Sequence, residues 1–133
     1  MPTNKKYTYA VGRRRSAVVT IKLFSGTSAS LVNGLAVDKY FPGLSAADIY
    51  NLPQLITKTK KKYYFVAKAM GGGKMGQLKA LALAISRVLL KTDPDFRSLL
   101  RPAGLLTVDS RRRQRRMVGT GGKARRQKQS PKR

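Results

Sequence analysis

The C-terminal stretch of this chain most constrains what it can fold into. Residues 110–133 hold eleven lysines and arginines, no acidic residue and only three apolar side chains, Met117, Val118 and Ala124. Such a segment cannot bury enough apolar surface to offset the entropy lost on ordering, so alone it should be disordered. Its charge density suits the phosphate backbone of a nucleic acid. We therefore expect a globular domain at residues 1–108 and an extended basic tail at residues 109–133.

Charge and composition argue against an enzyme. The 133 residues carry a formal net charge of +24, of which the tail supplies +11 and the rest of the chain +13. The chain lacks cysteine and histidine, and its five acidic residues are scattered aspartates. This leaves no thiolate metal site and no paired carboxylates for hydrolysis. We expect a cytoplasmic nucleic-acid-binding protein with no enzymatic activity, cofactor, metal, small-molecule substrate or membrane association.

Alternating apolar and polar residues predict a sheet of about four strands in the globular part. The alternation is cleanest in the first strand, where Ala17, Val19, Ile21 and Leu23 share one face. The pair Asn33-Gly34, which tolerates positive φ, closes the second strand. We expect the first two strands to form a hairpin and the last two to form another pair. The four strands are predicted at residues 16–24, 30–33, 54–58 and 62–69.

Helical periodicity is strongest between the last strand and the tail. A continuous apolar stripe predicts one long helix, formed by Leu78, Leu81, Ala82, Ile85, Val88 and Leu89. A short helix should begin at a capping box, residues 45–48, and stop before Pro53. Another should be capped by Asp93, with Pro94 at its first position. Strands and helices in this order predict an α+β domain, with the sheet packed against the helices.

A glycine-rich segment, Gly71–Gly76, precedes the long helix and matches G-x-G-x-x-G. The spacing alone would fit a dinucleotide-binding fingerprint, but no apolar parallel strand follows the helix to carry the required acidic residue. It is not a P-loop either, because Gln77 and Leu78 stand where Lys and Ser/Thr are required. A purely steric turn remains open. We favour a turn whose bare amides and Lys74 lie close to a phosphate.

Arginines and tyrosines supply the other candidate contacts. Arg13, Arg14 and Arg15 interrupt a strand-like segment, where they either protect a charged strand edge or contact phosphate. Four tyrosines (Tyr7, Tyr9, Tyr63 and Tyr64) could stack on unpaired bases, although such spacings are more typical of core positions. Gly119–Gly122 divides the tail into two basic blocks. The RNA-binding residues that we predict are Arg13, Arg14, Arg15, Lys74, Arg111, Arg112, Arg113, Arg115, Arg116, Lys123, Arg125, Arg126 and Lys128.

Taken together, these residues resemble the small-subunit ribosomal protein S-nine family, in its bacterial form. The resemblance covers nearly the whole chain, and its markers are specific in this order and spacing. They are Val11–Ala17, Val32–Gly34, Tyr40-Phe41, Gly71–Gly73 with Gly76-Gln77, Ala84–Leu90, Asp93-Pro94, Ala103–Thr107, Lys123–Arg126 and the terminal Lys132-Arg133.

The resemblance implies a fold, a location and a set of partners. The implied fold is a four-stranded sheet packed against helices, ribosomal S5 domain 2-like, with a left-handed β-α-β crossover. The implied location is the head of the small subunit, bound to the 3′ domain of 16S-type rRNA beside neighbouring head proteins. The tail would approach the peptidyl-site tRNA, with Lys132 and Arg133 as its contacts. Two alternatives stay open: a histone-like DNA-compacting protein and a small nucleotide-dependent enzyme built on Gly71–Gly76.

Overall fold

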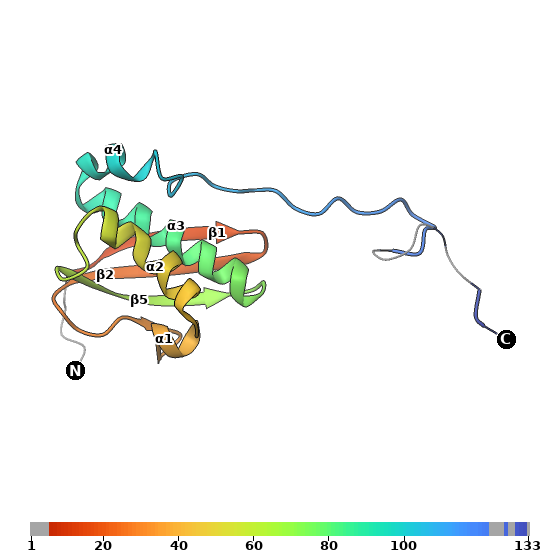
Figure 1. Ribbon diagram of the computed structural model, residues 1–133, viewed down its shortest axis with the longest axis horizontal. Coiled ribbons are helices and arrows are strands. Elements are labelled where there is room, and N and C mark those ends of the chain that lie inside the picture. The colour runs from red at the N-terminus through yellow and green to blue at the C-terminus, as the bar shows by residue number, and fades with distance from the viewer. Residues whose placement is uncertain (1–5, 123–126, 128–129, 133) are drawn as a thin grey trace.

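A computed structural model describes residues 6–122, 127 and 130–132, and it forms an α+β domain from which the chain leads away after residue 112 (Figure 1). The strands are β1 (Thr8–Arg14), β2 (Ala17–Ser25), β3 (Leu31–Val32), β4 (Leu35–Ala36) and β5 (Tyr63–Met70). The helices are α1 (Val37–Tyr40), α2 (Leu44–Ile56), α3 (Lys74–Thr92), the 3-10 helix η1 (Pro94–Phe96) and α4 (Arg97–Leu100). No helix among the described residues is long and apolar enough to cross a membrane.

The sheet has five strands in the order β1-β2-β5-β3-β4, so the expected number of four is wrong. The additional strands arise at both edges. At one edge, Asn33 (φ 51°) and Gly34 (φ 82°) form a tight turn that pairs β3 with the unpredicted β4. At the other edge, the segment before the arginine run forms β1. β3 and β5 are parallel neighbours; the handedness of the crossover between them stays a prediction.

Two predicted pairings are also wrong. β2 does not form a hairpin with β3, because its neighbours are β1 and β5, both antiparallel to it. Residues 54–58 are not a strand, since α2 runs through Pro53 to Ile56. A proline inside a helix costs about 3 kcal/mol, and here Tyr50, Pro53 and Gln54 are buried on the domain side of α2. Burial of this face, which sequence propensity does not register, outweighs the local cost.

The ends of the helices test the predicted capping residues. At the start of α2 the N-cap is Gly43, with no side-chain hydrogen bond, so the capping box expected at residues 45–48 is wrong. At η1 the prediction is confirmed, because the Asp93 carboxylate accepts a hydrogen bond from the Asp95 amide at 3.1 Å and Pro94 occupies the first position. The long helix is confirmed too, and its predicted stripe is buried.

All the helices that cover the sheet lie on one face (Figure 1). α3 crosses β1 and β2, and α2 packs beside it. The strand residues facing the helices are buried, among them Val19, Ile21 and Phe65. The closest approach is at Gly12, where any side chain would clash with the Ala80 carbonyl oxygen and the Ala84 amide nitrogen of α3.

The outer edge of β1 is closed by cations of α3. Arg87 Nη1 donates to the Val11 carbonyl at 2.8 Å, and Lys91 Nζ donates to the Tyr9 carbonyl at 2.7 Å. One helical turn of four residues rises about 6 Å, which matches the roughly 6.8 Å between alternate residues of a strand. These side chains therefore satisfy consecutive outward carbonyls and block pairing with another chain.

Candidate nucleic-acid interface

Three segments that are far apart in sequence meet at one end of the domain. Arg15 and Ser16 form the tight turn between β1 and β2. The glycine-rich segment lies against this turn, because a methyl group on Gly71 would lie only 2.6 Å from the Ser16 carbonyl oxygen. The start of the tail lies on the other side of the turn, where Arg112 Nη2 donates to the Arg15 carbonyl at 3.2 Å. We call this assembly the basic corner.

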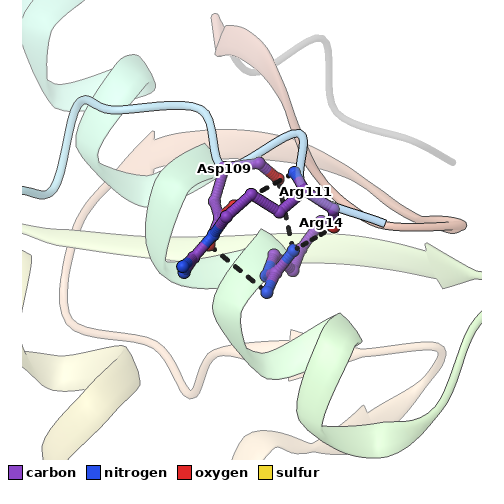
Figure 2. Close-up of polar contacts among 3 residues, drawn as sticks. All are labelled: Arg14, Asp109 and Arg111. Atoms are coloured by element: carbon purple, nitrogen blue, oxygen red, sulfur yellow. Dashed lines mark hydrogen bonds and ion pairs between the residues drawn. The ribbon is translucent and has the colours of Figure 1, made fainter. Parts of the chain in front are cut away.

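Asp109 joins the start of the tail to β1 (Figure 2). Its carboxylate forms an ion pair with Arg14 at 3.3 Å and another with Arg111 at 2.9 Å. Arg14 Nη1 also donates to the backbone carbonyls of Asp109 (3.3 Å) and Arg111 (3.1 Å). Only 11% of the Arg14 side chain is exposed. Arg14 therefore fixes the direction in which the chain leaves the domain, and its predicted contact with RNA stays a prediction.

The pKa of Asp109 lies well below its ordinary value. The main cause is the Arg111 guanidinium, which donates to the carboxylate, followed by the Arg111 amide, which donates at 3.1 Å. The charge of Arg14 contributes in the same direction, and the same pairing raises the pKa of Arg111. At neutral pH the carboxylate is thus ionised and its charge is matched by arginines, so it does not repel a nearby phosphate as a lone aspartate would.

A hydrogen-bond network fixes the glycine-rich segment from behind. Tyr40 donates its hydroxyl to Gln77 Oε1 at 2.7 Å, and Gln77 Nε2 donates to the Gly71 carbonyl at 3.0 Å. Asn33 supports Tyr40 and also bonds both backbone groups of Ala69 at the end of β5. Gly71 (φ 69°) and Gly72 (φ 61°) both adopt the left-handed conformation that other residues rarely take. The segment is therefore held in one shape before any ligand arrives.

Lys74, which the sequence placed in the glycine-rich turn, is the first residue of α3, and its ammonium group contacts the protein. Its Nζ lies 3.3 Å from the centre of the Tyr40 ring and donates to the Tyr40 carbonyl at 3.3 Å. Gly73 is the N-cap, and no acidic residue lies in the first helical turn. The helix dipole and Lys74 therefore leave the start of α3 positively charged.

The other predicted residues lie either at the basic corner or along the tail. Arg13 and Arg15 are exposed, and Arg15 has a positive φ of 55°. Beside them lies a groove of about 210 Å³ lined by β1, α3 and the start of the tail; Lys79 belongs to it and was not among the predicted residues. Within the tail, Arg111, Arg112, Arg113, Arg115, Arg116 and Lys132 are exposed. Lys123, Arg125, Arg126, Lys128 and Arg133 lie outside the described residues.

The dinucleotide-binding interpretation of Gly71–Gly76 does not fit this geometry. That motif requires a helix that joins two parallel strands of one sheet. Here β5 is antiparallel to β2, and α3 leads into η1 and α4, with no further strand in the part of the chain that the structure describes. What the segment presents is a positively charged helix start next to an arginine-bearing turn, which suits a phosphate.

Comparison with known proteins identifies the family. Residues 12–133 match the family model described as ribosomal protein S9/S16. The chain belongs to the ribosomal protein S9/S16 family. It is 42% identical over 119 residues to small ribosomal subunit protein uS9 of Maridesulfovibrio salexigens, a match covering 90% of this chain and 92% of the relative. It is 43% identical over 113 residues to the uS9 of Methylacidiphilum infernorum, with 85% and 83% covered.

Membership of this family confirms the predicted resemblance, including its bacterial form. The family consists of structural ribosomal components, so the chain is a ribosomal protein and not an enzyme. The RNA contacts predicted for the basic corner stay predictions.

Proposed function

We propose that this ribosomal protein binds the 16S-type rRNA of the small-subunit head through its basic corner. As an S9-family protein it is a structural constituent of the small subunit of the cytoplasmic ribosome and acts in translation. Ribosomal RNA and neighbouring ribosomal proteins are its partners in that role. The convergence of the arginine-bearing turn, the start of α3 and the start of the tail carries the proposal, because each presents positive charge to the same region.

The basic corner suits RNA phosphates because its cations are held by a rigid framework. Gly71 and Gly72 lie against Ser16 and Ala17, so the backbone of the turn that carries Arg15 is held by the glycine-rich segment. Preorganisation of this backbone reduces the entropy that binding must offset. RNA helices are recognised largely by shape and backbone, and arginine side chains that project from the turn suit bidentate contacts with phosphates.

The tail extends the same interface. Asp109 and Arg14 direct its first residues away from the domain, and Arg112 contacts the turn. We propose that the following basic residues neutralise phosphates inside the head, and that Lys132 and Arg133 reach the backbone of the peptidyl-site tRNA. The placement in the head and the tRNA contact rest on the family resemblance and on the tail's charge.

RNA binding at several salt concentrations, by variants in which arginine is replaced by uncharged glutamine, tests the role of the basic corner. Replacing Arg13 and Arg15 by glutamine should weaken binding of the full chain to 16S-type RNA. Each lost phosphate contact lowers the slope of log K against log salt by about 0.7–0.9, so the pair should lower it by about 1.4–1.8. The matched control replaces Lys39 and Lys61, exposed lysines in α1 and before β5, by glutamine. Equal slopes for the two double variants would contradict the proposal.

Deletion of residues 130–133 tests the tRNA contact separately. Ribosomes carrying this truncation should assemble normally but release peptidyl-site tRNA faster than wild-type ribosomes. An unchanged tRNA dissociation rate would refute the tRNA contact while leaving the RNA interface of the domain unaffected.

A further inference from the structure

The sheet has one face that no helix covers. The buried residues of β1, β2 and β5 alternate with a second set whose side chains point away from α2 and α3. On this second face Tyr7 is 52% exposed, Tyr9 46% and Met70 56%. The face is therefore an accessible surface of large side chains on a rigid three-strand support.

The strand register arranges these side chains in rows. One row runs from Tyr9 through Lys22 to Val66, because Tyr9 pairs with Lys22 and Lys22 pairs with Val66. The next row includes Thr20 and Lys68, which are also paired. Lys68 is thus the diagonal neighbour of Lys22, at about 7–8 Å. Both lysines are exposed, and they stand between apolar and aromatic neighbours.

Aromatic rings form a ladder at the end of the face remote from the basic corner. Phe24 stacks on Tyr64 with ring centres 5.3 Å apart, and Tyr7 packs on Phe24 at 5.8 Å. Lys22 Nζ lies 4.9 Å from the Tyr7 ring. The rings are fixed by one another, so an added base would find a preorganised stack.

From these observations we propose that the open face of the sheet binds an unpaired stretch of RNA. Bases would stack on Tyr7 and Tyr9, and phosphates would pair with Lys22 and Lys68. Charge complementarity favours RNA, because the face carries cations and no acidic residue among its described positions: Tyr7, Tyr9, Val11, Arg13, Val18, Thr20, Lys22, Phe24, Leu31, Tyr64, Val66, Lys68 and Met70. A neutral protein partner would bury two lysines without counter-charges, which is unfavourable.

Continuity with the basic corner supports the same occupant. β1 and β2 carry most of the open face, and the Arg15–Ser16 turn connects them. An RNA strand leaving that turn would cross the open face without meeting a negative charge on it. The inference rests on the proposed function, since it extends RNA binding from the basic corner to a second surface. In the sequence, the tyrosines that could stack on unpaired bases were the indication of such a surface.

Photocrosslinking in reconstituted small subunits tests the proposal. The full chain is assembled into subunits and irradiated, and the peptides attached to RNA are identified. We expect RNA on the tryptic peptides of residues 7–13 and 63–68, which carry Tyr7, Tyr9 and Tyr64. Crosslinks on peptides of the tail alone would overturn the inference and leave the proposed function standing. Crosslinks from the open face to an acidic protein would also overturn it.

Affinity variants give an independent measure on purified full chain and 16S-type RNA. Replacing Lys22 and Lys68 by glutamine should lower the salt slope by about 1.4, the value for two single-strand phosphate contacts. Replacing Tyr9 by leucine keeps an apolar side chain at an exposed position and should weaken binding roughly 5- to 150-fold through loss of stacking. The Lys39 and Lys61 double variant serves again as the control. If the open-face variants match this control while the Arg13 and Arg15 variant does not, the inference is wrong and the basic corner stands.

Discussion

Substitution of Gly71 by alanine should break the contact between the glycine-rich segment and the β1–β2 turn. Gly71 has a φ of 69°, and its added methyl group would lie 2.6 Å from the Ser16 carbonyl oxygen. The left-handed conformation costs a residue other than glycine about 1–2 kcal/mol. Relief of the close contact requires the turn or the segment to shift, which adds roughly 1 kcal/mol.

The net effect includes a gain from the unfolded state. Alanine restricts the unfolded chain and recovers about 0.4–1 kcal/mol, so the free energy of unfolding should fall by about 1–2.5 kcal/mol. For a domain of this size that corresponds to a decrease in Tm of roughly 4–11 °C. Affinity for 16S-type RNA should also fall, because displacement of the turn moves Arg15.

Gly73 provides a matched control two residues away. Its φ is −101°, and a methyl group there would meet nothing within 4 Å. Gly73→Ala should therefore change the free energy of unfolding by no more than about 1 kcal/mol. Thermal unfolding and RNA binding of both variants check the reasoning. If Gly71→Ala behaves like Gly73→Ala in both assays, the segment is not locked to the turn as described.

Removing residues 110–133 should lower the salt slope for RNA by about 8–10, if all eleven cations contact phosphate; an unaltered slope would mean that the tail does not engage RNA. Because the folded-state pKa of Asp109 is lowered, its pairs should persist at neutral pH and be lost only at a pH well below about 4, the ordinary pKa of an aspartate. The Arg111 amide resonance reports this, and Asp109→Asn should abolish the titration. Burial, assisted by the hydrogen bond to Asp38, raises the pKa of Tyr50 to about 12. Stability should therefore decline as pH rises from about 10 towards that value, and urea unfolding of Tyr50→Phe should show a smaller decline.

Elements with strong local patterns were predictable from sequence. β2 and β5 each bury one face, and the apolar stripe of the long helix is buried as well, so the periodicity of these elements records the tertiary environment directly. The Asp93-Pro94 start of η1 was predictable for a different reason, since capping is a contact between neighbouring residues. α2 was not: Pro53 reads as a helix stop, and only packing against α3 explains why the helix continues.

The candidate site was predictable in part: the sequence indicated which cationic residues belong to it, but not how they are arranged in space. Composition indicated Arg13, Arg15 and the tail, but nothing local showed that Arg14 would turn inward to the start of the tail. Asp109 is the last acidic residue of the sequence and directly precedes the basic residues of the tail. This position was the one feature of the sequence that could have indicated an ion pair. The network through Asn33, Tyr40 and Gln77 could not be predicted, because its members come together only when the sheet and α3 are formed.

Crosslinking in living cells tests the central claim most directly. Cells expressing the full chain are irradiated with ultraviolet light, and the nucleic acid attached to the protein is sequenced. We expect crosslinks confined to the head of the small-subunit rRNA, together with tail crosslinks to tRNA anticodon stems. A diffuse distribution over genomic DNA or unrelated RNAs would contradict it and would favour a protein that compacts nucleic acid through charge alone.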